Sequence, residues 1–553
     1  MKTFVALLLF LVSSTSFGQG KANVKKLEKI VAAVVKKVMS ATVKIAAFDT
    51  LSQTLAVSRF SGVIVNADGL ILTAAHATQP REVYQVCFPN GHKVLAKGLG
   101  RISLGKDKLA TDVAMLQIIE KGKWPFAEMA CSGEMLVGQP CIGISFPGTF
   151  EQQLPNVRLG RIENVDISKG NFQSSCKMEP GDSGRALFDA KGRLIGIHSW
   201  ILPDENQNFE VPIDFYRKYW DALHIPISYD NLPLATAIKT VSRGSAADSI
   251  PPLDLIDKLT AAETSAVVNI SNVVNGGLIF LLGTVIRVEE KGKSTSYIIT
   301  KNAMIRDRIL VGAKQLTAKA IYRDVENDLV LLRVDGDIPR GIDVAHYRKI
   351  KDLRLGMFLF SPLGGDKTRT GIVSTGEIEM TLKYSIGYFG AIANFINDKV
   401  TITEIAKGSP ADGIVQKYDQ ILAINSVELN QPKQYGAELA RYYPNDTISI
   451  DAIRQGQKIS YKVRLGVFRS NSHTADNFQG GRSSRSDGYK KVIAQDAALK
   501  PNECGGPVFD AEGCFVGINI GRHSRTSTII MPVVAIDEFC KRYLEQVDNI
   551  SSK

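Results

Sequence analysis

Short runs of apolar residues, about four to eight long, recur through most of the chain between turns that contain Gly, Asp or Asn. The segments SGVIVNADGLILTAAHA (61–77) and TDVAMLQI (111–118) show this pattern and are rich in Val, Ile and Leu. Apolar runs of that length between turn residues predict β-strands. We therefore expect an all-β protein whose strands close into barrels, with a helical lead-in before residue 42.

The chain also repeats itself. GDSGRALFDAKGRLIGI (181–197) aligns without a gap on NECGGPVFDAEGCFVGI (502–518). Upstream, residues 61–77 pair with 282–304, and TDVAMLQI pairs with NDLVLLRV, residues 327–334. Self-similarity of this kind indicates two related halves. The second half contains about 105 more residues than the first between its aligned landmarks.

Those extra residues include GYFGAIANFINDKVTITEIAKGSPADGIVQKYDQILAINSVEL, residues 387–429. This segment resembles a PDZ domain of the type attached to bacterial trypsin-like proteases. The resemblance implies that the loop Tyr388, Phe389, Gly390 and Ala391 holds the carboxylate of a peptide C-terminus, which adds a strand to the sheet edge. A PDZ-shaped spacer that binds nothing is the alternative. The Ser-, Gly- and Arg-rich stretch that follows, GVFRSNSHTADNFQGGRSSRSDGYKK, is predicted to be a mobile loop.

Three motifs of the first half carry candidate chemistry. LTAAHA places His76, TDVAML places Asp112 and EPGDSG places Ser183, in that chain order. A serine hydroxyl needs a neighbouring base, which histidine supplies near neutral pH, and a buried carboxylate fixes the imidazole tautomer. The N–H groups of Gly181 and Ser183 are expected to bind the oxyanion. The half resembles a trypsin-like serine protease, closest to the periplasmic high-temperature-requirement (HtrA-like) proteases, which implies a chymotrypsin/trypsin-like double β-barrel.

The resemblance also implies a specificity pocket. In GIHSWI (196–201), Ser199 is expected to support Asp112, Trp200 to line the pocket and Ile201 to narrow its entrance. Small or medium aliphatic side chains are then expected before the cleaved bond. Lys177 falls where such proteases set charge preference. It either points inward and favours acidic side chains or points outward into solvent.

The second half has lost parts of this constellation. Ala303 stands at the histidine position, Asp328 is retained, and Cys504 stands at the nucleophile position. Asn502 replaces the oxyanion glycine. A thiolate needs a neighbouring base or cation, and the sequence shows neither beside Cys504. We predict an inactive pseudoprotease domain, with a redox or thiol role for Cys504 as the alternative.

Composition narrows the partners and the compartment. The net charge is +11, but no basic stretch is interleaved with aromatic residues, so nucleic acid is not expected. The start MKTFVALLLFLVSSTSFGQG is typical of a cleaved secretory signal, and no later segment is long enough for an integral membrane span. Seven cysteines are too few for a disulfide scaffold, although Cys131 with Cys141 or Cys87 with Cys176 is a conceivable pair. No metal site or cofactor is expected.

These patterns predict an ordered series of domains. They are a signal peptide (1–18), an active trypsin-like domain (24–224), a linker (225–255), the first part of an inactive trypsin-like domain (256–383), an inserted PDZ domain (384–467), and a mobile loop with the remainder of the inactive domain (468–547). The expected function is a secreted or periplasmic serine endopeptidase that cleaves unfolded or misfolded envelope proteins. A noncatalytic peptide-binding chaperone or scaffold and a narrow processing enzyme are the alternatives. The natural substrate and any homo-oligomer stay open.

Overall fold

The computed structural model describes most of the chain after residue 23. The described residues are 24–104, 111–150, 152–168, 170–236, 264–274, 277–290, 292–306, 308–339, 341–344, 352–365, 367–431, 433–467 and 473–551. The predicted signal peptide (1–18) lies outside them, and so does the part of the predicted linker from residue 237 onward.

The first half begins with a helix over residues 24–38 and continues into a sheet that curls until β5 pairs with β6. In β5 the burial of side chains alternates, as expected for a strand with one face on a core. The strand order is β13-β5-β4-β1-β2-β3-β6. The strands are β1 (Thr42–Asp49), β2 (Thr54–Ile64), β3 (Leu70–Thr73), β4 (Val83–Cys87), β5 (Lys93–Ser103), β6 (Asp112–Ile118) and β13 (Ser228–Tyr229).

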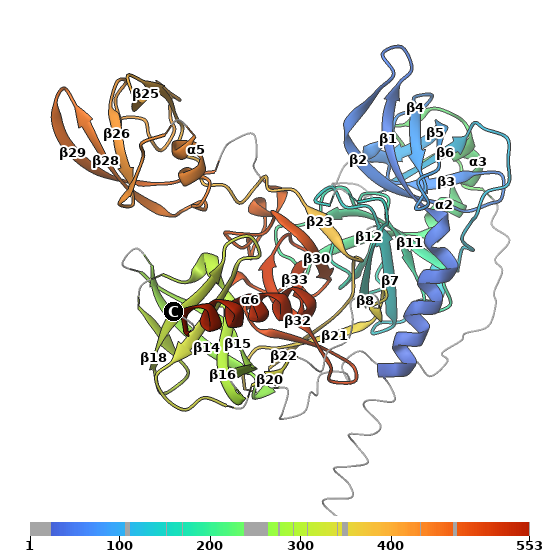
Figure 1. Ribbon diagram of the computed structural model, residues 1–553. Coiled ribbons are helices and arrows are strands. Elements are labelled where there is room, and N and C mark those ends of the chain that lie inside the picture. Colours follow the sequence, from blue (N-terminus) through green and yellow to red (C-terminus); the bar gives the residue numbers. More distant parts are fainter. Residues whose placement is uncertain are drawn as a thin grey trace, which may run out of the picture.

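A second barrel completes the first half and is closed, in the order β10-β11-β12-β9-β8-β7 (Figure 1). Its strands are β7 (Pro140–Ser145), β8 (Asn156–Asn164), β9 (Phe172–Ser174), β10 (Ala186–Phe188), β11 (Leu194–Ile201) and β12 (Asn208–Pro212). The helices α2 (Ile213–Lys218) and α3 (Trp220–His224) follow, and short 3-10 turns are η1 (Met39–Ala41), η2 (Ala75–Ala77) and η3 (Ser132–Glu134).

The second half repeats this architecture with two seven-stranded sheets. The first holds β14 (Val267–Val274), β15 (Gly277–Glu290), β16 (Lys293–Lys301), β17 (Ile309–Val311), β18 (Leu316–Asp324), β19 (Leu329–Val334) and β20 (Ile342–Asp343). The other holds β21 (Phe358–Pro362), β22 (Thr368–Ile372), β23 (Ile378–Met380), β30 (Tyr489–Gln495), β31 (Pro507–Asp510), β32 (Phe515–Arg522) and β33 (Thr528–Pro532). The turns η5 (Asn302–Met304), η8 (Thr474–Asn477) and η9 (Pro501–Glu503) and the helix α6 (Val533–Ser551) complete it. The all-β, double-barrel expectation is confirmed.

Between β23 and β30 the chain forms a separate small sheet, ordered β24-β25-β26-β28-β29, to one side of the barrels (Figure 1). Its elements are β24 (Ala391–Ile396), β25 (Lys399–Ile405), β26 (Gln420–Ile424), β27 (Val427–Glu428), α5 (Gln434–Leu439), β28 (Thr447–Arg454) and β29 (Gln457–Arg464). The sheet has a hydrophobic core of its own. It corresponds to the segment that resembles a PDZ domain.

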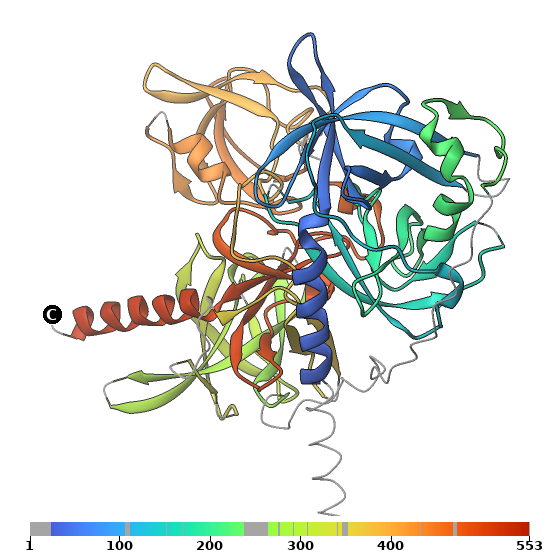
Figure 2. The same cartoon turned by 90° about the vertical axis from the view of Figure 1, so that its right-hand side faces the viewer.

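The two barrel halves are packed against each other and share one apolar cluster. The helix over residues 24–38, drawn in blue in Figure 2, buries Leu27 and Val31 in the same cluster as Phe358 and Phe360 of the second half. At Gly356 an added Cβ would lie 2.6 Å from Val31, so helix and second half are in close contact there. Large buried apolar contacts oppose independent motion of the halves. The barrels of the first and second halves therefore belong to one packed body.

The stretch predicted to be a mobile loop is partly packed. From residue 473 onward it is described, and Ser483, Arg485, Ser486 and Asp487 are buried. The composition of Ser, Gly and Arg predicted mobility, but the Arg485 guanidinium donates to the carbonyls of Val325 and Glu326, and the Ser483 hydroxyl accepts a hydrogen bond from the Arg522 N–H. Ser483 and residues 485–487 are therefore packed into the second half, which does not fit the predicted mobility at these positions.

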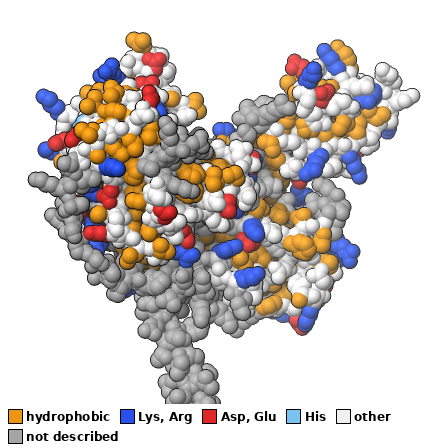
Figure 3. Space-filling model, turned by 180° about the vertical axis from the view of Figure 1, so that it is seen from behind, with side chains coloured by type: hydrophobic (Ala, Val, Ile, Leu, Met, Phe, Trp, Pro, Cys, Tyr) orange, Lys and Arg blue, Asp and Glu red, His pale blue; other side chains and the backbone are white. Residues whose placement is uncertain are grey.

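On the face shown in Figure 3, the Lys and Arg side chains that are drawn in colour are scattered among acidic and apolar side chains. In the described part of the chain no helix is long and apolar enough to cross a bilayer. Neither suggested disulfide forms, because all seven cysteines are free thiols.

Candidate active site

Three side chains meet where the two barrels of the first half face each other. His76 lies in η2 just after β3, Asp112 is the first residue of β6, and Ser183 precedes β10. The imidazole Nε2 lies 2.8 Å from Ser183 Oγ, and Nδ1 lies 2.7 Å from Asp112 Oδ2. Both distances are within hydrogen-bond range. The structure thus brings together the three residues that separate motifs had singled out.

Asp112 is fixed by further donors. The backbone N–H of His76 donates to Oδ1 at 2.8 Å, and the Ser199 hydroxyl donates to Oδ2 at 2.6 Å. The carboxylate is buried, whereas the His76 side chain is 48% exposed. The Asp112 end of this hydrogen-bonded series is therefore buried and fixed, whereas the His76 end is exposed.

The pKa values of the pair are shifted in opposite directions. Burial opposes ionisation of Asp112, but the hydrogen bonds from His76 and Ser199 outweigh it and hold the carboxyl pKa below its ordinary value. Burial also disfavours the imidazolium of His76, but the hydrogen bond and the negative charge of Asp112 outweigh it, so the pKa rises above 6.5. His76 is thereby a stronger base than an isolated histidine.

The turn before Ser183 is shaped for an oxyanion. Gly181 has φ of +98°, and a Cβ there would lie 2.3 Å from the backbone nitrogen of Gly148. The carbonyl of Pro180 accepts a hydrogen bond from Gly148 N–H at 3.0 Å. Because the two ends of a trans peptide unit point opposite ways, the Gly181 N–H is directed away from Gly148. Only glycine fits this backbone, and the motif GDSG supplies it.

A buried arginine holds this turn, and sequence reasoning missed it. Arg158 of β8 contacts the carboxylate of Asp182, which also accepts a hydrogen bond from Ser145 at 2.6 Å. Arg158 also donates to Glu179 Oε1 at 3.1 Å, and all these carboxylates are buried. Buried charges persist when they are paired and hydrogen-bonded. The signal available in the sequence was an arginine within the otherwise apolar strand NVRLG.

Arg185 also turns out to support the turn. Arg185 lies two residues after Ser183, in the sequence GDSGRA. Its buried guanidinium donates to the carbonyl oxygens of Lys177 and Cys176 at 3.1 and 3.0 Å. Arg185 therefore binds the backbone of the segment that leads into the turn at Gly181.

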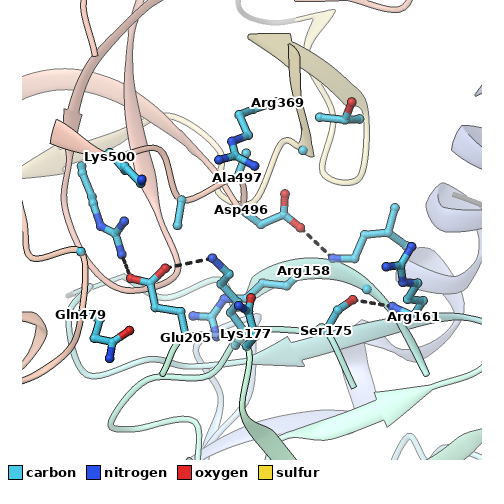
Figure 4. A pocket seen from close by; sticks show the side chains of 18 of the residues that line it. Arg158, Arg161, Ser175, Lys177, Glu205, Arg369, Gln479, Asp496, Ala497 and Lys500 are labelled. Atoms are coloured by element: carbon cyan, nitrogen blue, oxygen red, sulfur yellow. Dashed lines mark hydrogen bonds and ion pairs between the residues drawn. The ribbon is translucent and has the colours of Figure 1, made fainter. Parts of the chain in front are cut away.

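The residues expected to form the specificity pocket divide into two groups. Trp200 stacks on Phe209 with ring centroids 4.0 Å apart, and half-buried Ile201 pairs with Asn208 in the adjacent strand. The Lys177 ammonium, in contrast, binds Glu205 at 3.1 Å and lines a cavity of about 720 Å³ between the two halves (Figure 4). Both readings of Lys177, as a pocket charge and as a solvated lysine, need correction, because its side chain is paired and only 26% exposed.

The second half keeps the frame of this site. The N–H groups of Ser61 and Leu282 donate to the carbonyls of Ser183 and Cys504, at 2.9 and 3.2 Å respectively. Gly184 and Gly505 share a positive φ, +81° and +100°, and a Cβ at either would lie within 2.1 Å of a backbone oxygen. The repeat seen in the sequence is therefore a repeat of backbone hydrogen bonds.

The second half does not keep the relay. The Ala303 N–H donates to Asp328 Oδ1 at 2.6 Å, as the His76 N–H does to Asp112. The other carboxylate oxygen is taken by the buried ammonium of Lys301 at 3.1 Å, which also contacts the carbonyl of Ile520. Lys301 is the cation that sequence reasoning missed. Burial raises the pKa of the Cys504 thiol even though the charge of Lys301 lowers it.

In the second half, Ser483 and Arg485 bind β32 and the turn before Asp328. The Ser483 N–H donates to the carbonyl of Arg522 at 2.9 Å, and the Arg522 N–H donates to the Ser483 hydroxyl at 3.0 Å. By the repeat, Arg522 corresponds to Ile201 at the end of β11. Arg485 then donates to the carbonyls of Val325 and Glu326. A pocket of about 500 Å³, lined in part by Ala303 and Ser483, lies beside this segment.

The PDZ-like loop gathers at one end of a groove. Tyr388 exchanges two backbone hydrogen bonds with Gly466, at 2.8 and 2.9 Å, and Gly390 has φ of +86°. Ala391 begins β24, which is the edge strand of its sheet. The groove measures about 580 Å³, and its walls include all four loop residues, Phe389 among them, together with Leu439. The described residues contain no group of His, Cys, Asp or Glu that could hold a metal ion.

Comparison with known proteins adds sequence relatives. Residues 60–197 match the model of a trypsin-like peptidase domain, and residues 379–465 match a PDZ domain. The chain is 28% identical over 190 residues to a "Probable periplasmic serine endoprotease DegP-like" of Halomonas elongata, covering 33% of this chain and 39% of the relative. A protein of the same name from Pseudomonas fluorescens is 26% identical over 419 residues, covering 73% of this chain and 79% of the relative.

Among solved structures, "HtrA-type protease AlgW with tripeptide" matches at 16% identity and a TM-score of 0.30, covering 79% of this chain and 97% of that one.

Proposed function

We propose that this chain, which carries a trypsin-like peptidase domain and a PDZ domain and is homologous to serine proteases of the DegP and HtrA type, is itself a secreted or periplasmic serine endopeptidase. The observation that carries the proposal is the continuous hydrogen-bonded series Ser183, His76 and Asp112. The relatives are named as periplasmic, and the signal-like N-terminus agrees with export.

The geometry supports an acyl-transfer mechanism. Ser183 Oγ attacks the substrate carbonyl while His76 Nε2 takes its proton, and Asp112 stabilises the imidazolium. The N–H groups of Gly181 and Ser183 donate to the oxyanion of the tetrahedral intermediate. Collapse releases the amine, which receives the proton from His76, and leaves an acyl group on Ser183. Water then attacks the acyl group by the same proton path in reverse.

The proposed substrates are unfolded or misfolded envelope proteins. A trypsin-like cleft accepts an extended chain along the edge of β11, and only an unfolded segment presents such a chain. Trp200 and Ile201 leave room for small or medium aliphatic side chains before the cleaved bond. The groove beside Tyr388 to Ala391 would take a peptide C-terminus by strand addition to β24.

The second half is proposed to be a pseudoprotease. Three observations support this. Lys301 occupies the carboxylate that a histidine would use, Cys504 is buried with a raised pKa, and the Ser483 backbone is bonded to Arg522, at the position that corresponds to Ile201. A noncatalytic scaffold in which both barrels bind peptides is the alternative that the test below separates.

The test is hydrolysis of an unfolded protein by the purified mature chain. With casein as substrate, we expect cleavage that Ser183→Ala abolishes and that the matched variant Cys504→Ala leaves within about twofold. No cleavage of casein or short peptides by the folded wild-type chain would contradict the proposal. Cleavage of one peptide without any of casein would instead indicate a narrow processing enzyme.

A further inference from the structure

The second half reaches into the first through a loop that is buried from end to end. Residues 523–527 connect β32 with β33; together with Arg522, the last residue of β32, they form a segment in which each residue is at most 1% exposed. Connecting loops usually run over the surface, because their backbone groups need water as a partner. This loop, here named the bridging loop, finds its partners in the first half.

Its Thr526 binds the oxyanion turn. The Thr526 hydroxyl donates to Glu179 Oε1 at 2.7 Å. Glu179 stands two residues before Gly181, and its carbonyl accepts the Asp182 N–H at 3.0 Å, so it is part of the turn that aims the oxyanion donors. The carboxylate is buried, and its other oxygen has no hydrogen-bond partner. Loss of the threonine hydroxyl would therefore leave a buried carboxylate still less satisfied.

Its arginines and histidine bind the flanking walls. Arg525 donates to the carbonyls of Leu202 and Asp204 at 2.8 and 2.7 Å, directly after the pocket strand β11. Arg522 contacts Glu205, the partner of Lys177 (Figure 4). His523 Nε2 lies 3.1 Å from the carbonyl oxygen of Thr149, next to Gly148, whose N–H donates to the Pro180 carbonyl.

The strand that carries Arg158 is held by the second half as well. On either side of Arg158, the Val157 N–H donates to the carbonyl of Ser374 at 3.0 Å, and the Leu159 N–H donates to Asp496 Oδ2 at 2.8 Å. Arg158 in turn forms an ion pair with the carboxylate of Asp182. The second half thus restrains the oxyanion turn directly through Thr526 and indirectly through β8.

We propose that the inactive half is a built-in positioning element, in which the bridging loop holds the oxyanion turn and the pocket wall of the first half in the geometry that cleaves. Glycine adopts positive and negative φ about equally readily, so the φ of +98° at Gly181 has to be fixed by its surroundings rather than by the residue itself. Catalytic groups must be held within about 0.5 Å of the productive geometry. This inference rests on the proposed function and assigns Thr526 and Arg525 as positioning residues.

The decisive variants differ by one hydroxyl. Thr526→Val keeps the shape and removes the donor, and Thr526→Ser restores a donor. The matched control is Thr300→Val, another fully buried threonine, whose hydroxyl donates only within the second half, to Leu282 at 2.7 Å. For each, kcat and KM are measured on a peptide ester that is too short to reach the PDZ groove, and thermal unfolding is followed in parallel.

We expect Thr526→Val to lower kcat about 10- to 100-fold with KM changed less than about threefold, because displacement of about 1 Å at a catalytic group costs up to about 10²-fold. Thr526→Ser should recover most of kcat, and Thr300→Val should retain wild-type kcat even if its unfolding temperature falls equally. Arg525→Met, which frees the pocket wall, should raise KM about tenfold, and it supplies a second readout if Thr526→Val does not fold.

The inference is overturned if folded Thr526→Val keeps wild-type kcat, or if Thr300→Val loses as much kcat as Thr526→Val. Inactivity of the wild-type chain itself would count against the proposed function and not against the positioning role, so the two failures are distinguishable.

Discussion

Asp112 and Asp328 occupy equivalent positions in two related domains, but their carboxylates have different partners. Asp112 is hydrogen-bonded to Ser199 and to His76, whose other ring nitrogen faces Ser183, whereas Asp328 is paired with the buried ammonium of Lys301. Both keep the backbone donor that begins the site. The comparison teaches that the frame of a protease and its chemistry are separable. A buried carboxylate needs a partner, but that partner need not be a base.

The largest expected difference between the halves is in hydrolysis. Ser183→Ala should lower kcat by about 10⁶-fold, because removal of a nucleophile leaves only binding and oxyanion stabilisation. Cys504→Ala should change kcat by less than twofold. Steady-state kinetics on a chromogenic peptide measure both, and a large loss in the cysteine variant would mean that the second half takes part in the chemistry.

Substitution of Asp112 should reduce activity, whereas substitution of Asp328 should reduce stability. Asp112→Asn should reduce kcat by about 10⁴-fold, since the amide holds the wrong imidazole tautomer. Asp328→Asn should leave Lys301 buried without a counter-charge and lower the free energy of unfolding by about 3–5 kcal/mol. Urea denaturation and kinetics, run on both variants, separate these effects. The comparison is wrong if Asp328→Asn unfolds like the wild type.

The oxyanion turn gives the next effect. Gly181→Ala forces a Cβ against Gly148 at a backbone φ of +98°, so the donor must move. We expect kcat to fall about 10²- to 10³-fold, the usual loss for one oxyanion donor, with little change in KM. Asn502→Gly in the second half serves as the control and should create no activity. An unchanged kcat in Gly181→Ala would show that this N–H is not used.

The smallest predicted effect is a shift of pH dependence. His76 must be neutral to accept the proton from Ser183, and Asp112 raises its pKa above 6.5. Activity should therefore be full above the raised pKa and fall as the pH drops through it. Ser199→Ala removes one hydrogen bond to Asp112. We therefore expect a shift in the pH at which kcat/KM falls on the acid side. An acid limb at or below pH 6.5 in the wild type would contradict the account.

The sequence predicted what local motifs determine. The triad residues lie at strand ends within short motifs, and the repeat located Ala303 and Cys504 by alignment alone. Arg158, Lys301 and Thr526 escaped prediction because they stand in no motif that marks a site, and only the folded barrels bring them to their partners, which lie 24, 27 and 347 residues away. Lys177 was placed wrongly for the same reason, since Glu205 and the second half, not solvent, surround it.

The central claim is that a single proton relay exists, in the first half. It is tested most directly by labelling the native wild-type chain with a fluorophosphonate, which reacts with activated serines, and mapping the adduct by mass spectrometry. The account predicts one adduct, on the peptide that contains Ser183, and none after His76→Ala. A folded chain that takes no label, or one whose label lies in the second half, would contradict it.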